Sequence, residues 1–332
     1  MSKGGNMPGP DPSPRTWSAH SSTCARQTLV LLAAIVAGSL LAPTRSCVAD
    51  DRPKSSTSRV VRDAAIQALP FDRLTAEARA KIENVISHVS IYRHVPTEMI
   101  PCDPDMFLFL SRHPEVVVGI WDLMGITQIQ LERTGEFTFS AADQSGTTAD
   151  VELLYGTYDT QIMYADGVYD GPLFRKPVQG VCLLVLRSKY YRDALGQTHV
   201  KGALDVFLRV NHAGAELLTR TLHPLVGRAT DYNMLETTRF FGKISQAAES
   251  NGPGIQRMAT RLTQIEPIVQ QQFARVAGDI SDRASQRRAL ELNGEELAES
   301  SRTAIQTSAS PPASIYQAGG RQPRRKFVVM RR

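Results

Sequence analysis

From residue 126 to residue 210 the apolar side chains recur mainly at every second position, and this pattern constrains the fold more than any other feature of the chain. The segment Val200–Val210 alternates over nearly its whole length. A period of two is typical of a β-strand that buries one face. Turn residues such as Thr134-Gly135 and Asp166-Gly167 separate the segments at hairpin-sized distances. We therefore expect about six or seven strands in an antiparallel sheet.

Helical patterns come before these strands. Residues 60–69 and 74–87 have helical spacing, with Asp72 as a candidate cap of the second helix, and a strand-like stretch then ends at Pro101. Asp103-Pro104 predicts a helix start, because an aspartate can cap the first turn and proline is tolerated there. His113-Pro114 breaks the chain and starts a second, strongly apolar helix that runs to Gly125. An apolar helix of this kind is expected to be buried.

A long helix is expected after the strands. Asp231 is a candidate cap for a helix to about Ser250, and the sequence Asn251–Gly254 then ends it. The pattern predicts an α+β fold in which a curved antiparallel sheet of six or seven strands packs on this long helix. It assigns residues 50–59 to a linker, 60–250 to the α+β domain with its N-terminal helices, 255–300 to a helical extension, and 303–332 to a disordered basic tail. An apolar stripe in the extension is a candidate self-association surface: Ile255, Met258, Leu262, Ile265 and Val269.

The N-terminal residues predict export. Residues 29–42 form an uncharged apolar run of 14 residues that follows Arg26, and small residues at Cys47 and Ala49 fit a cleavage site. This is the arrangement of a secretory signal peptide, and the run is short for a transmembrane helix. We expect residues 1–49 to be removed near Ala49 and the mature chain to be periplasmic or extracellular, without a transmembrane span. An uncleaved N-terminal anchor is the alternative.

The net charge of +5 is concentrated at the two ends of the chain. Residues 1–49 carry +3 and residues 321–332 carry +6, which leaves −4 for residues 50–320. A nucleic-acid-binding domain needs a basic face within the folded part. The charge distribution therefore argues against a nucleic-acid partner.

Two cysteines remain after the expected cleavage, Cys102 and Cys182. An oxidising compartment permits a disulfide between them, and buried free thiols are the equal alternative. No spacing in the sequence decides between the two.

The sequence contains no established catalytic motif, so we name no catalytic residue, metal ligand or cofactor. His212, Glu216 and His223 would share one side of a helix, but Pro224 and the apolar residues opposite favour a solvated face. Aromatic and polar side chains that could line a binding pocket are the better candidates. They are Trp121, Tyr155, Tyr164, Tyr169, Arg93 and His88.

The order of elements from residue 85 to residue 250 resembles the helix-grip superfamily, which includes START lipid-transfer domains and polyketide-cyclase-like proteins. The resemblance rests on the strand before Pro101, the two helices around His113-Pro114, the strands from Ile126 to Val210, and the helix after Asp231. It implies an apolar cavity between the sheet and the long helix. The helix after residue 254 departs from that layout.

Three functions fit these observations. The first is an exported, non-catalytic module that binds a hydrophobic or amphipathic small molecule. The second is a structural or interaction protein of the cell envelope with a packed core and a helical self-association segment. The third is a cyclase- or hydrolase-like enzyme that uses groups such as His88, Arg93 or Tyr164. No acid–base pair can be placed by spacing, so the third function has the least support.

Overall fold

The computed structural model describes residues 54–308, except residues 173, 175, 195 and 212–222. The expected signal peptide, the tail from residue 309, and His212 and Glu216 lie outside the described residues. Residues 303–308, which were expected to be part of a disordered tail, are helical.

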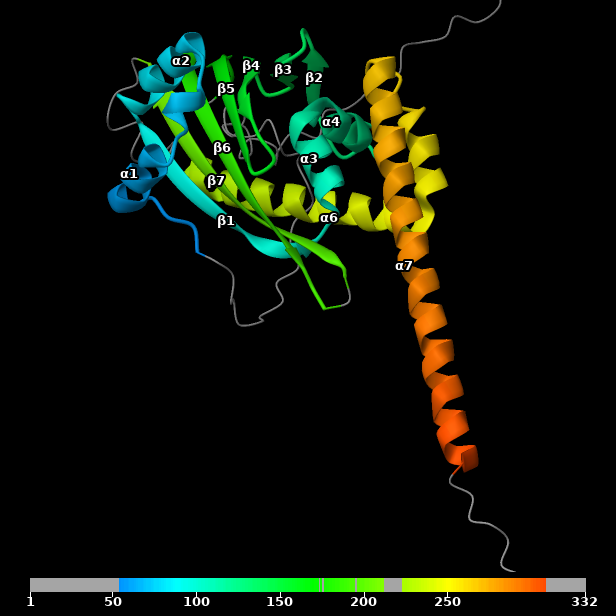
Figure 1. The fold of residues 1–332 in the computed structure, drawn as a ribbon. Helices are drawn as coiled ribbons and strands as arrows, with labels where there is room; N and C mark the ends of the chain where they lie inside the picture. Colours follow the sequence, from blue (N-terminus) through cyan, green and yellow to red (C-terminus); the bar gives the residue numbers. More distant parts are fainter. Residues whose placement is uncertain (1–53, 173, 175, 195, 212–222, 309–332) are drawn as a thin grey trace, which may run out of the picture. The chain divides into compact units, whose positions relative to one another are not determined.

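One antiparallel sheet of seven strands organises the described part of the chain (Figure 1), and the expected α+β class with a curved sheet is confirmed. The order across the sheet is β1-β7-β6-β5-β4-β3-β2, so every neighbouring pair except β1 and β7 is also consecutive in sequence. The strands are β1 (Ile91–Pro101), β2 (Ile129–Arg133), β3 (Thr138–Asp143), β4 (Thr147–Gly156), β5 (Thr160–Tyr169), β6 (Val178–Arg192) and β7 (Thr198–Val210).

Helices cover both faces of the sheet. One face packs on α3 (Pro104–Arg112), α4 (Pro114–Leu123) and α6 (His223–Ala259). The first part of α7 (Pro267–Ser308) extends the same core by packing on these helices, with Phe273 stacked on Phe109 of α3. The opposite face packs on α1 (Arg59–Gln67) and α2 (Ala76–Ile86). Phe207 of β7 is fully buried in the core between this face and the two helices. Strand β6 has apolar side chains on both of its faces, so both faces need a cover. Cys182 and Leu184 belong to the first core, and Leu183 and Val185 belong to the second.

Only some of the helix boundaries follow the local signals in the sequence. Asp103 caps α3 by accepting a hydrogen bond from the backbone N–H of Asp105, as expected. The cap of α2 is Thr75, whose hydroxyl oxygen accepts from the N–H of Ala78, so the expectation for Asp72 was wrong. The long helix begins at His223, before Asp231, and Asn251 makes a kink inside it where the sequence predicted an end.

The chain divides into two compact units, with the boundary after Asp282 and inside α7. Residues 255–282 therefore belong to the same unit as the sheet. The apolar stripe is not a free surface, since Leu262, Ile265 and Val269 are buried in the core next to α4. Ile255 is buried with them, and Met258 packs against the same core.

Candidate functional site

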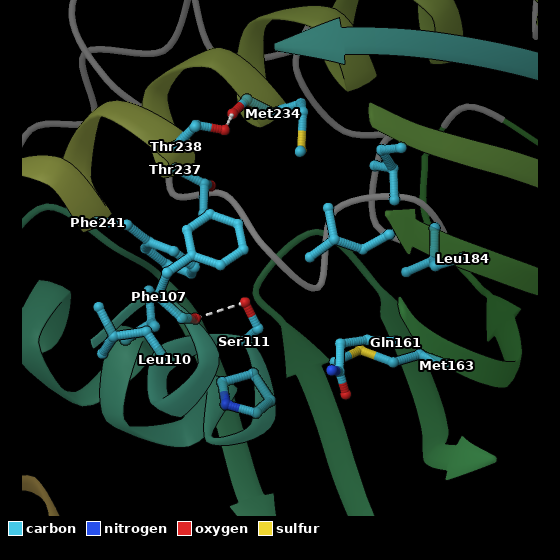
Figure 2. Close-up of a pocket in the computed structure, with 14 residues that line it drawn as sticks. Phe107, Leu110, Ser111, Gln161, Met163, Leu184, Met234, Thr237, Thr238 and Phe241 are labelled. Atoms are coloured by element: carbon cyan, nitrogen blue, oxygen red, sulfur yellow. Dashed lines mark hydrogen bonds between the residues drawn. The ribbon is translucent and has the colours of Figure 1, made fainter. Parts of the chain in front are cut away.

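A small apolar cavity lies between the sheet and three helices (Figure 2). Its volume is about 60 Å³. Strands β5, β6 and β7 form one wall, and α3, α4 and α6 form the other. The lining is almost wholly apolar and includes Phe107, Leu184, Met163, Met234 and Phe241. An apolar cavity of this kind is expected to remain dry and to accept apolar atoms.

The polar side chains in the cavity wall bond to nearby groups of the chain. The Ser111 hydroxyl donates to the carbonyl of Phe107 at 2.7 Å, and the Thr238 hydroxyl donates to the carbonyl of Met234 at 2.5 Å. Gln161 donates its side-chain amide to the carbonyl of Thr157. These intrachain bonds satisfy polar groups that would be costly to bury unpaired. The wall therefore presents mainly apolar surface to an occupant.

The aromatic candidates from the sequence do not line this cavity. Trp121 is buried in the core, where the centroid of its ring lies 5.5 Å from the ring centroid of Phe240. Tyr155 and Tyr164 pack in the other core, under α1 and α2. Tyr169 is buried with its ring against Phe174. Their role in the described structure is packing.

The two polar candidates are not among the residues that line the cavity either. His88 is exposed after the end of α2, and its ring contacts the Ser87 hydroxyl. Arg93 lies on β1 and forms an ion pair with Asp231 of α6. Since Arg93 and Tyr164 belong to opposite faces of the sheet, the structure does not assemble the set named for an enzyme.

Cys102 and Cys182 are free and buried, so the candidate disulfide is not formed. The strand register gives the reason. Pro101 pairs with His199, and His199 pairs with Tyr191, which is nine residues from Cys182 along β6. That offset corresponds to about 30 Å along the strand, whereas bridged cysteines have Cα atoms within about 7 Å.

Burial raises the pKa of both thiols from the ordinary value of 9.0 to about 12. A pKa that is higher in the folded chain gives stability that is complete below pH 9 and is lost as the pH rises towards 12. Raising the pH from 8 to 10.5 should therefore lower the free energy of unfolding by about 2 kcal/mol, because the Cys182 thiol ionises in the unfolded chain but not in the folded chain. We expect urea denaturation to show a smaller loss over this interval for Cys182→Ala. An equal loss in both chains would contradict this account.

Sequence reasoning missed a buried carboxylate on the side of the sheet that faces α1. Asp205 of β7 has a side chain only 3% exposed, and it accepts from Arg187 at 2.6 Å and from the Tyr92 hydroxyl at 2.8 Å. The ring Nδ1 of His94 lies 2.7 Å from the same carboxylate. Arg187 also donates to the carbonyl of Ala65 in α1. This network satisfies the buried charge and connects α1 to the sheet.

A second buried carboxylate lies at the start of α4. Glu115 accepts two hydrogen bonds from Arg133 of β2, at 2.7 and 2.9 Å, and Arg133 also lies over the ring of Phe139. The contacts connect α4 to the edge of the sheet. Neither carboxylate belongs to a metal site: among the described residues, no three His, Cys, Asp or Glu side chains are grouped so that they could hold an ion.

Comparison with known proteins gives no family. No family model and no curated protein matches the chain. Among solved structures, the Mll3558 protein from Rhizobium loti is 11% identical over 43% of this chain and 95% of that chain, with a TM-score of 0.22. That score is too low to support an argument. In the part of the chain that the structure describes, no helix has the length and apolar character that crossing a membrane requires.

Proposed function

We propose that this chain is an exported, non-catalytic module that binds a small apolar molecule, or the apolar part of an amphipathic one, in the cavity between the sheet and α6. The single observation that supports the proposal is the apolar cavity enclosed by β5–β7 and by α3, α4 and α6. Its position is the one that the resemblance to the helix-grip superfamily implies.

The size of the cavity limits what can enter without a change in the walls. Sites for drug-sized ligands usually have volumes of about 300–1,000 Å³, against about 60 Å³ here. Met163 and Met234 lie on opposite walls. Methionine side chains are unbranched and adapt to irregular spaces. We infer that a ligand enters by displacing these two side chains, which makes slender or small apolar molecules the best candidates.

Toluene, a neutral apolar probe, tests the proposal. We expect it to shift backbone amide NMR signals of residues that line the cavity. Met163→Ala enlarges the cavity and should strengthen binding at least threefold, whereas Leu184→Phe fills the cavity and should abolish binding. Leu123→Phe adds the same ring at a position outside the cavity lining that is 37% exposed, and it should leave toluene binding unchanged.

The second candidate is a packed scaffold without a ligand. The observation in its favour is the small cavity volume in a sheet whose two faces are both covered by helices. Two results together would favour the scaffold over the binding module. Toluene would bind neither the original chain nor Met163→Ala, and native mass spectrometry after mild purification would find no bound small molecule.

A further inference from the structure

A second hollow lies on another side of α6, between that helix, the edge strand β1 and residues 54–55. We call it the β1–α6 groove. Its volume is about 470 Å³, which falls within the range of small-molecule sites. Arg93 and Glu98 of β1, and Arg228 and Asp231 of α6, are among its charged side chains. It is therefore larger and more polar than the apolar cavity.

The groove and the apolar cavity use different faces of α6. Successive residues of an α-helix are separated by about 100° around the axis. On that basis the face with Arg228, Asp231 and Leu235 is rotated by about 100° from the face with Met234 and Phe241. Binding in the groove is thus a separate property from binding in the cavity.

The acidic side chains of the groove already have basic partners. Asp231 accepts from Nε of Arg93 at 2.9 Å and contacts Nη2 of the same guanidinium. Glu98 lies 3.3 Å from the guanidinium of Arg239. A carboxylate paired with arginine attracts a further cation only weakly, because the two charges compensate each other. The carboxylates therefore do not make the groove a cation site.

Two basic side chains of the groove remain uncompensated. Within the described residues, Lys54 and Arg228 have no hydrogen-bond or ion-pair partner. Both are exposed, and both line the groove. The groove consequently has an excess of positive charge, although residues 50–320 as a whole carry −4. This local excess favours an anionic occupant.

We propose that the β1–α6 groove binds a small organic anion. Arg228 and Lys54 bind the anionic group, since a guanidinium and an ammonium are the usual partners of carboxylates and phosphates. The apolar part of the molecule packs on Val95, Pro96 and Leu235, which also line the groove. The ion pair with Asp231 holds Arg93 in place at the groove wall.

Benzoate, titrated into the full-length chain, tests this inference, with its neutral analogue benzamide as the comparison. We expect benzoate to shift the amide NMR signals of residues 93–98 and 228–235, and benzamide to bind at least tenfold more weakly. Arg228→Gln and Lys54→Gln should each weaken benzoate binding at least threefold. Lys243→Gln removes an exposed cation from α6 outside the groove and should have no effect.

Equal binding of benzamide and benzoate would overturn the inference, as would unchanged benzoate affinity in both Arg228→Gln and Lys54→Gln. The result can be separated from that of the proposed function. Leu184→Phe fills the apolar cavity and should leave benzoate binding intact, and Arg228→Gln should leave toluene binding intact.

Discussion

Replacing Asp205 by alanine is expected to lower the free energy of unfolding by about 3 kcal/mol. The substitution removes the acceptor for Arg187 and for the Tyr92 hydroxyl, and the charged partner of the His94 ring. Losing one member of a buried charged pair typically costs 3–5 kcal/mol. We expect the lower end because Arg187 and His94 are 28% and 26% exposed and can recover some solvation. Urea denaturation measures the loss.

Two variants make the Asp205 result specific. Asp205→Asn retains an oxygen that can accept from Tyr92 and should cost less than Asp205→Ala. Asp150→Ala removes an exposed carboxylate of β4 that pairs in register with Asp166, another exposed acid. It should change stability by less than about 0.5 kcal/mol. If Asp205→Ala has an effect as small as that of Asp150→Ala, the network does not stabilise the fold.

The strands and their antiparallel pairing could be predicted because the relevant information is local. Alternation in Val200–Val210 and the turn residues around Asp166-Gly167 depend only on neighbouring residues. The start of α3 was predictable for the same reason, since Asp103 and Pro104 act within one helical turn.

It was harder to predict which faces of the sheet are buried. A period of two assigns side chains to two faces of a strand, but it does not show which of these faces other elements cover. In Val200–Val210 the alternation indicates one apolar face, and it says nothing about the opposite face, on which Asp205 lies. That face is covered by α1 and α2, so Asp205 and Phe207 are buried there. Tyr155 and Tyr164 were misplaced for the same reason. The continuously apolar stretch Val181–Leu186 was the available signal that both faces are covered.

The apolar cavity and the β1–α6 groove were also hard to predict, because both depend on contacts between distant parts of the sequence. The resemblance to the helix-grip superfamily implies a space between sheet and helix, but the size of the cavity depends on how residues from β5–β7 and from three helices fit together. The β1–α6 groove depends on pairings such as Arg93 with Asp231, which are 138 residues apart in sequence. No local pattern contains that contact.

Replacing Phe273 by alanine is expected to lower the free energy of unfolding by about 4 kcal/mol, because the side chain is fully buried and the surrounding core cannot fill the space. Its ring stacks on Phe109 of α3 with the centroids 5.5 Å apart, and the His113 ring stacks on Phe109 in turn. Ile268→Ala, at a position of α7 that is 57% exposed, should cost less than about 0.5 kcal/mol. Thermal and urea denaturation of the two variants measure the difference. Equal stabilities would show that the first turns of α7 do not share the core of the sheet, and the buried position of Leu262 and Val269 would then need another explanation.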